Sequence, residues 1–408
     1  MLTPYGRVLS RPGALAFSLA GLGARLPNSM VGLGLVLLVE SATGSYGRAG
    51  LVAAVYVLAQ AALAVPQGRW IDRWGQGPML LGTGVVWSLG LLGVVAVVQA
   101  DGPLGLAAAV AALSGAAFPA GGACIRARWS ALLEEPADRE TAFALESVVD
   151  EVVYLLGPLL ITLLATTVHP AAGLVAAAVL GGVGAVALAA QRRTAPARHP
   201  RARGDRPVAA MPWRSVVPLA VVSLAFGTLF GAAEVSTVAT AEDAGRTGAA
   251  GPLLALWALG SLVAGLVAGT VAWRHGPGTR LRWGSAAMLV AILGIGLAAA
   301  TGSLIALGAA FVIAGSAIAP TMIAAFTAVE QRVPTPRLTE GMAFLQTGLG
   351  AGIAPGAALA GAVIDARDGA SGFVVAVLGG LVALLASLTL PPDPARRPVA
   401  APAATGPR

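Results

Sequence analysis

The sequence predicts an all-α, polytopic membrane protein with twelve transmembrane helices in two six-helix, pseudo-symmetric bundles. Composition is the first observation behind this prediction. The 408 residues are 57% hydrophobic and 11% charged, with a mean hydropathy of +0.80, whereas soluble domains carry about 25% charged residues. The 54 glycines and 27 prolines agree with it, because both residues are more frequent in membrane helices than in soluble ones.

Apolar runs long enough to cross a bilayer are the second observation. We expect spans at about 13–39, 48–68, 78–99, 103–124, 140–166, 170–190, 214–241, 247–272, 280–300, 303–328, 338–364 and 370–390. Residues 1–190 would form the first bundle and 213–390 the second. Between them, residues 191–212 form an Arg- and Pro-rich linker, and we expect 391–408 to be a disordered tail.

An internal repeat is the third observation. GRWIDRWGQG at 68–77 aligns with GTVAWRHGPG at 269–278, an offset of 201 residues. At an offset of 200, Pro136, Glu140, Leu145 and Glu146 align with Pro336, Glu340, Leu345 and Gln346. A nearly constant offset indicates duplicated halves, an architecture that alternating-access carriers use.

Charge placement predicts the orientation. All 26 basic residues are arginines. With both termini in the cytoplasm, 22 of them, including Arg126 and Arg128, fall in inner segments. Positive charge accumulates on the cytoplasmic side of membrane proteins. Six tryptophans, including Trp129, would form a belt at the inner interface.

The function classes that remain are few. No nucleic-acid motif is present. The arginines that make the chain basic are scattered over many short loops, a distribution that membrane topology explains better than nucleic-acid binding does. One cysteine and three histidines form no metal-ligand cluster, and no histidine lies in the body of a span. We therefore expect no enzyme, no metal and no cofactor, with a proton gradient as the energy source.

Within the fifth span, the stretch TAFALESVVDEVVYLLGP at 141–158 carries three acids. Carboxylates within a span are costly and mark ion or substrate paths. Glu146 and Asp150 share one helical stripe, and Glu151 lies about 100° round. Arg25, near the middle of the first span, is expected to pair with Asp150 or Glu151. The acid left over would undergo reversible protonation, and Glu146 would pass protons inward.

Other candidate cavity residues lie outside the fifth span. Glu234, in the outer part of the seventh span, would be an outer gate or a substrate contact, or would face water. Gln346 is the counterpart of Glu146 in the repeat. Phe226 and Phe230 would contribute to an aromatic cavity suited to amphipathic or cationic organic molecules; helix packing or lipid contact is the alternative for each.

GRWIDRWG resembles the G-x-x-x-D-R-x-G signature of the major facilitator superfamily, between spans two and three. With the twelve spans and the repeat, the resemblance covers essentially the whole chain. It implies that Gly68, Arg69, Asp72, Arg73 and Gly75 form a gating loop that latches the inner gate in the outward-facing state. Trp273 replaces the aspartate in the second half, so that latch is expected to be weaker or apolar.

Two further features bear on the resemblance to exporters. Gly157 and Pro158 in span five match part of the Gly-Pro motif of proton-coupled exporters, and Pro355 lies in the glycine-rich span eleven; all three would bend their helices. The arginine that many proton-driven exporters carry inside span four is missing, because 104–124 has no charge.

The leading hypothesis is a monomeric, proton-coupled exporter (an antiporter) of small amphipathic drugs or metabolites in a bacterial plasma membrane. Its partners would be the small-molecule substrate, protons and the lipid bilayer, with no nucleic acid. Proton-coupled uptake of a sugar or organic acid is the alternative within this class. A non-transporting receptor or scaffold is the alternative from another class.

Overall fold

A computed structural model describes residues 3–197, 210–246 and 249–393, and its regular elements are all helices. Eleven of these helices are long and apolar enough to cross a membrane, and α2 with α3, bent by 43°, supplies a twelfth span. The predicted linker and tail fall largely outside the described residues.

The first bundle (N-bundle) follows α1 (Thr3–Leu9). Its spans are α2 (Ala14–Arg25) with η1 (Leu26–Ser29) and α3 (Val31–Thr43), α4 (Tyr46–Trp74), α5 (Gln76–Gln99), α6 (Leu104–Ala116) with α7 (Gly121–Leu132), α8 (Pro136–Thr167) and α9 (Ala172–Ala190). The second bundle (C-bundle) comprises α10 (Trp213–Asp243), α11 (Ala250–Ala268), α12 (Pro277–Ala300), α13 (Leu304–Arg332), α14 (Leu338–Ala366) and α15 (Phe373–Leu388).

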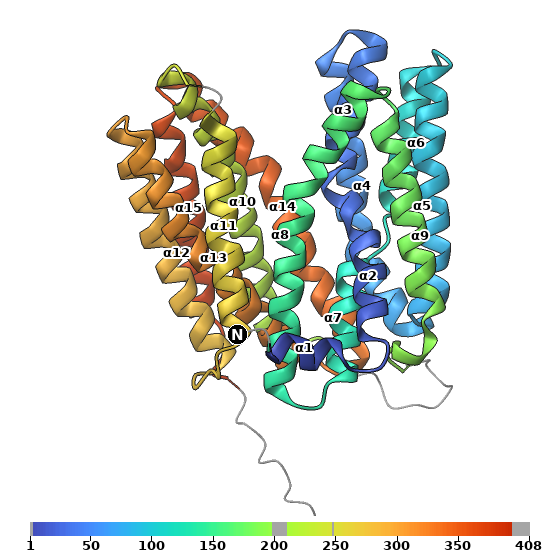
Figure 1. Cartoon of the computed structure of the whole chain (residues 1–408), viewed down its shortest axis with the longest axis vertical. Helices are drawn as coiled ribbons and strands as arrows, with labels where there is room; N and C mark the ends of the chain where they lie inside the picture. Colours follow the sequence, from blue (N-terminus) through green and yellow to red (C-terminus); the bar gives the residue numbers. More distant parts are fainter. Residues whose placement is uncertain (1–2, 198–209, 247–248, 394–408) are drawn as a thin grey trace, which may run out of the picture.

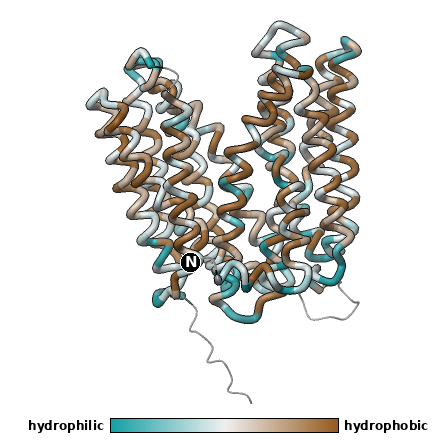
Figure 2. Tube along the Cα trace, viewed as in Figure 1, coloured by the Kyte–Doolittle hydropathy of each residue, from teal (hydrophilic) through white to brown (hydrophobic). Residues whose placement is uncertain are grey.

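The bundles meet at one end of the molecule and diverge toward the other (Figure 1). We call the meeting end the base; it carries α1, the connection at residues 269–276 and the end of α15. Helices α8 and α14 are equivalent in the repeat, and each packs against the other bundle there: α8 against α11 and α13, α14 against α4 and α7. Hydrophilic residues concentrate at the base and in the loops of the opposite end, whereas the helices between are mainly apolar (Figure 2).

Small residues allow close helix contacts within the C-bundle. On α10, a Cβ atom at Gly227 or Gly231 would clash with the carbonyl oxygens of Leu349 and Ile353 on α14. In the opposite direction, Gly356 faces the backbone of α10 with equally little room. Without a hydrophobic driving force between helices in lipid, such van der Waals contact is a main source of stability.

Two predicted boundaries are wrong. The fourth span does not end near residue 124; α6 breaks at residues 117–120 and α7 continues to Leu132. The predicted gating loop is not a loop either, because α4 remains helical to Trp74 and only Gly75 breaks it, with a φ of 90°. Pro119, which has no N–H to donate, lies within the break in span four.

Candidate functional site

The break between α2 and α3 places Arg25 inside the N-bundle. Helix α2 ends at Arg25, and Pro27 lies in the short 3₁₀ turn that follows. The residue is 6% exposed, and its Nε donates to the carbonyl oxygen of Gly21 at 3.2 Å. A guanidinium buried at this depth requires anionic partners.

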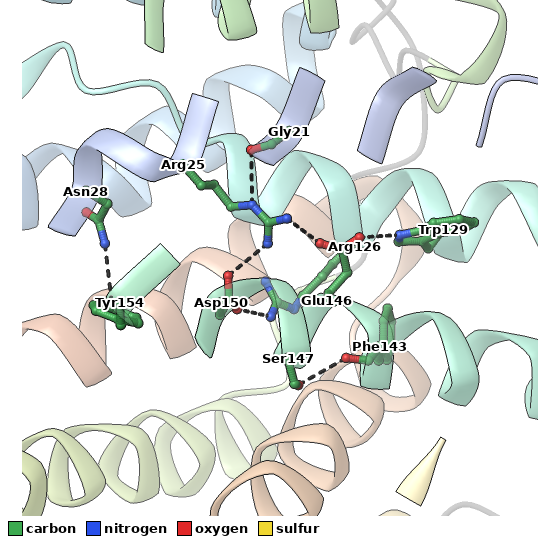
Figure 3. A network of polar contacts seen from close by, with 10 residues as sticks. All are labelled: Gly21, Arg25, Asn28, Arg126, Trp129, Phe143, Glu146, Ser147, Asp150 and Tyr154. Carbon is green, nitrogen blue, oxygen red and sulfur yellow. Dashed lines mark hydrogen bonds and ion pairs between the residues drawn. The ribbon is translucent and has the colours of Figure 1, made fainter. Parts of the chain in front are cut away.

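Two carboxylates of α8 supply those partners (Figure 3). Arg25 Nη2 lies 2.6 Å from Glu146 Oε2, and Nη1 lies 2.8 Å from Asp150 Oδ1. A spacing of four residues puts both acids on one face of α8, so one guanidinium reaches both. Glu146 is fully buried, and its Oε1 accepts from the indole Nε1–H of Trp129 at 2.7 Å. Trp129 is therefore an interior residue, and its prediction as part of an interfacial belt is wrong.

A second arginine, Arg126 on α7, completes the cluster. Its Nη2 lies 2.6 Å from Asp150 Oδ2, and the residue has no exposed surface. Its Cζ lies 3.9 Å from the centre of the Phe326 ring on α13, a cation–π contact across the bundle boundary. We call Arg25, Arg126, Glu146 and Asp150 the charge cluster; as ionised groups their charges balance.

Arg126 and Arg128 lie inside span four, which extends to Leu132, so the predictions that they lie outside the membrane and that this span lacks an arginine are wrong. The repeat contained the missing signal. At an offset of 200, position 126 corresponds to 326, which lies inside the tenth predicted span, so the fourth span should have been extended equally far. Arg128 is also fully buried, but it points away from the cluster to Gln76 Oε1 (2.7 Å) and the Leu188 carbonyl (2.8 Å).

Glu151 stands apart from the charge cluster. Its Oε1 accepts a hydrogen bond of 2.5 Å from Ser261 Oγ on α11, so the contact joins the two bundles. Among the described residues, no arginine or histidine lies within ion-pair distance of it. Asp150 and Glu151 were the two acids predicted to pair with Arg25. The structure pairs Arg25 with Asp150, and the partner of Glu151 is the hydroxyl group of Ser261.

Gln346 on α14 approaches the cluster from the C-bundle. A Cβ atom built on Gly122 of α7 would lie 3.0 Å from Gln346 Nε2, 3.4 Å from Arg25 Cδ and 3.6 Å from Arg126 Nη1. Glycine at 122 therefore keeps a space open between these three side chains.

The remaining cavity candidates lie elsewhere. Phe226 and Phe230 belong to a chain of aromatic contacts inside the C-bundle that continues through Trp257 to Phe311, with ring centres 5.3–6.0 Å apart. Phe226 is fully buried in this core. Glu234 is exposed on α10, toward the end of the helix that lies away from the base.

The gating motif contacts the start of α14. Asp72 accepts hydrogen bonds from the backbone N–H groups of Thr339 (3.2 Å) and Glu340 (2.9 Å), and Arg69 Nη2 lies 2.7 Å from Glu340 Oε1. Helix N-termini offer unpaired N–H groups and favour negative charge. A Cβ at Gly68 would lie 3.0 Å from the Cα of Glu340, so glycine permits this approach. Exposed Arg73 is not part of it and contacts Trp74.

The second half has a counterpart that is not apolar, contrary to one of the predicted outcomes. Arg280 Nη2 lies 3.0 Å from Glu140 Oε1, and its guanidinium covers the ring of Trp273 at 4.9 Å. Arg139 and Glu330 form another pair between the bundles at 2.6 Å. Ion pairs therefore join the two bundles at the base both in the first gating motif and in its counterpart in the second half.

The three helix-bending candidates lie inside continuous helices, Gly157 and Pro158 in α8 and Pro355 in α14. A Cβ at Gly157 would clash with Ser29 Oγ, which donates to the carbonyl of Val153 at 2.7 Å. Gly157 thus lets α8 lie against the bend of the first span.

Two repeated bundles of membrane-spanning helices that meet at one end are an architecture of membrane transporters. The sequence profile of the Major Facilitator Superfamily matches residues 17–339. The chain belongs to this superfamily.

Solved structures show the same fold. The human organic anion transporter MFSD10 is 17% identical with a TM-score of 0.72, covering 92% of this chain and 99% of its own. A bacterial homologue of the iron transporter ferroportin, in its outward-facing state, is 16% identical with a TM-score of 0.72, covering 95% and 99%. A variant of the E. coli fucose:proton symporter FucP is 15% identical with a TM-score of 0.64, covering 92% and 98%. No curated protein sequence matches the chain.

Proposed function

We propose that this transporter is a proton-coupled exporter of small amphipathic organic molecules, an antiporter that works by alternating access as a monomer in a bacterial plasma membrane. The base is its cytoplasmic side. Once Arg126 and Arg128 are assigned to a span, 20 of the 26 arginines still fall in segments expected on the cytoplasmic side. With the bundles joined at the base, the structure then corresponds to an outward-facing state.

The contact between Glu151 and Ser261 is the observation that carries the proposal. A carboxyl group with a hydroxyl partner and no cation can be buried either charged or neutral, since serine can donate to it or accept from it. By contrast, Asp150 contacts two guanidinium groups, one through each carboxylate oxygen. Glu151 is thus the proton carrier, and the charge cluster positions α8.

The contact also couples protonation to conformation. Ionised Glu151 accepts from Ser261 and holds α8 against α11, which helps to keep the base closed. A proton arriving from the outside removes the negative charge and weakens this contact. The bundles then rock about the middle of α8, the latches of Asp72 and Glu140 separate, and the carrier opens to the cytoplasm. There it releases the proton and takes up the substrate.

Export is favoured over uptake by the Gly157–Pro158 pair, which resembles the motif of proton-coupled exporters. One structural relative is a fucose:proton symporter, so proton coupling is compatible with this fold. Uptake of an organic acid is a second candidate, because Arg126 adds a buried cation to span four, where the sequence predicted no charge.

Proteoliposome transport with an imposed pH gradient tests the proposal. We expect a gradient to drive efflux of an amphipathic dye, and Glu151→Gln to abolish the gradient-driven part while leaving counterflow of the dye intact. Glu242→Gln, at an exposed position near the outer end of α10, is the matched control. Gradient-driven flux of wild-type size from Glu151→Gln would reject Glu151 as the carrier. Dye flux that runs only in the same direction as the protons would favour symport.

A further inference from the structure

Three polar side chains of the N-bundle form a hydrogen-bonded series that joins three spans. Gln60 Nε2 on α4 donates to Asn28 Oδ1 in η1 at 2.9 Å, and Asn28 Nδ2 donates to the phenol oxygen of Tyr154 on α8 at 3.3 Å. Each residue lies near the middle of its span. Gln60 is the central residue of α4, Asn28 lies in the bend between α2 and α3, and Tyr154 follows the centre of α8 by less than one turn. We call Asn28, Gln60 and Tyr154 the polar relay.

The direction of Tyr154 follows from its neighbours on α8. Asp150 faces the charge cluster inside the N-bundle, and Glu151 faces Ser261 on α11 of the C-bundle. At about 100° per residue, Tyr154 projects about 40° from Asp150 and about 60° from Glu151, between these two directions. The phenol therefore points toward the space where the two bundles face each other.

The other end of the polar relay lies on the same wall of the N-bundle. Helix α4 packs against α14 at the base, and α8 packs there against α11 and α13, so both helices border the C-bundle. A relay that runs from α4 to α8 therefore crosses the wall that faces the C-bundle. Away from the base the bundles diverge (Figure 1). Figure 3 shows the bond between Asn28 and Tyr154 on the side of the charge cluster away from Trp129.

The polar relay has room in front of it. Tyr154 is 44% exposed, Asn28 is exposed and Gln60 is half-buried. In the part of the chain that the structure describes, the hydrogen bonds of these three side chains all lie within the N-bundle. Exposed polar atoms near the middle of a membrane are costly unless they border a water-filled cavity or a substrate path. Packing of the N-bundle therefore does not account for them.

The order of donors and acceptors determines what Tyr154 offers. A phenol oxygen accepts a hydrogen bond, and its O–H donates one. Because Asn28 Nδ2 already donates to the oxygen, the O–H of Tyr154 remains available as a donor. Gln60 holds Asn28 in this orientation by donating to its Oδ1, and successive hydrogen bonds in one direction polarise one another. The polar relay thus directs a donor into the space between the bundles, beside a partly exposed aromatic ring.

The charges near the polar relay are already engaged. One turn toward the base, the two arginines of the charge cluster balance Glu146 and Asp150. Glu151 is directed to Ser261. The relay itself consists of two amides and a phenol, which are uncharged at neutral pH. An ionic substrate group would therefore lose its hydration here without gaining a free counterion, whereas a neutral oxygen acceptor loses much less.

We propose that Tyr154 binds the transported substrate and that the polar relay selects uncharged molecules with an oxygen acceptor. The inference rests on the proposed transport function and specifies its substrate class: neutral, planar, amphipathic molecules that carry a carbonyl group. Tyr154 donates to the carbonyl oxygen, and its ring packs against the apolar part of the molecule. Asn28 and Gln60 are positioning residues that act through Tyr154.

Binding to the purified full-length protein tests this assignment independently of transport. Radiolabelled coumarin is the neutral carbonyl probe; coumarin-3-carboxylate and N-methylquinolinium are an anion and a cation with the same two rings, and competition measures their affinities. We expect each charged probe to bind at least tenfold more weakly than coumarin. Tyr154→Phe, which removes only the O–H, should raise the Kd of coumarin about fivefold. Tyr56→Phe is the matched control, because it deletes a phenol O–H of α4 that is buried beside Trp87; the Kd should not change.

A double-variant cycle tests the positioning role. Asn28→Leu should weaken coumarin binding about as much as Tyr154→Phe does, and Gln60→Leu should weaken it less. Added to Tyr154→Phe, Asn28→Leu should have no further effect, because Asn28 acts through the phenol O–H. Additive losses would reject the relay. A wild-type Kd in Tyr154→Phe, or a charged probe that binds as tightly as coumarin, would overturn the proposal.

Transport separates this inference from the proposed function. Proton-driven efflux of an amphipathic dye that is equal in the wild type and Tyr154→Phe, with no coumarin binding by the wild type, would end the substrate assignment and leave the exporter standing. Coumarin binding that depends on Tyr154, without any proton-driven flux, would support the assignment and reject proton coupling.

Discussion

Ser261 of α11 donates a hydrogen bond of 2.5 Å to Glu151 of α8, and the two residues belong to different bundles. Farther toward the base, Arg280 and Glu140 join the same two bundles at 3.0 Å. The bundles therefore share a series of polar contacts from the base toward the middle of the membrane. Of these two contacts, that of Glu151 pairs an acid with a neutral hydroxyl, so a proton can change it without breaking an ion pair.

Ser261→Ala should shift the carrier toward the state that is open at the base. Hydrogen bonds between membrane helices contribute about 0.6–1.7 kcal/mol, so the population ratio should change by roughly 3- to 20-fold. Distances between spin labels at Ser41 and Thr301, both exposed at the opposite end, would report the change. The single native cysteine, Cys124, is buried and adds little background. An unchanged distance distribution would show that the contact does not hold the bundles.

Asp72→Asn should open the base, because it removes the charge that accepts the two N–H groups of α14. Hydrogen bonds to charged groups contribute about 1.5–3 kcal/mol, so we expect an increase of about tenfold or more in the open population. Labelling of a cysteine at Ser130, which borders a cavity beside Asp72, measures it. Arg73→Gln, outside the latch, is the control; equal labelling of both variants would argue against a latch role for Asp72.

Arg25→Ala should destabilise the N-bundle strongly, since it leaves Glu146 and part of Asp150 without their cation. Removing one partner of a buried pair typically costs about 3–5 kcal/mol. Unfolding in mixed micelles measures the loss. The double variant Arg25→Ala/Glu146→Gln also removes the carboxylate that Arg25→Ala leaves without its cation. It should therefore recover part of the lost stability. A double variant as unstable as the single one would mean that Glu146 does not depend on Arg25.

Gly356→Ala should weaken the contact between α14 and α10, because the added methyl would clash with the backbone of Thr228. Overpacking typically costs about 1–3 kcal/mol. Gly350→Ala lies on the same helix, where a Cβ meets nothing within 4 Å, so it should be neutral or slightly stabilising. Thermal unfolding of the two variants gives the comparison, and equal midpoints would exclude a close-contact role for Gly356.

Acid should release the segment around Asp393 from α12. Asp393 accepts from the N–H of Gly278 at 2.8 Å and pairs with Arg332 at 2.7 Å. Burial raises the pKa of Asp393, but the bonds from Arg332 and Gly278 outweigh it, so the pKa lies below its ordinary value.

The stability that Asp393 contributes is therefore present above the ordinary carboxyl pKa and is lost as pH falls through the lowered one. Asp393→Asn should reduce the thermal midpoint at neutral pH and flatten its acid decline. Asp101→Asn, at an exposed turn, serves as control. A wild-type acid decline in Asp393→Asn would assign that decline to other groups.

The sequence by itself determined the number of spans, the twofold repeat and the superfamily, because hydrophobic length and loop charge act locally and need no tertiary contacts. It also identified Arg25, Asp72 and three of the acids of α8 (Glu146, Asp150 and Glu151) as unusual, since charge inside an apolar run is visible without a fold. Only the tertiary structure decided which charges meet. The bend at Pro27, the break at Pro119 and the packing of α8 and α14 against the opposite bundles bring Arg126 to Asp150, Ser261 to Glu151 and Gln346 to Gly122. Those pairings depend on side-chain direction between helices far apart in sequence, which periodicity within one helix cannot specify.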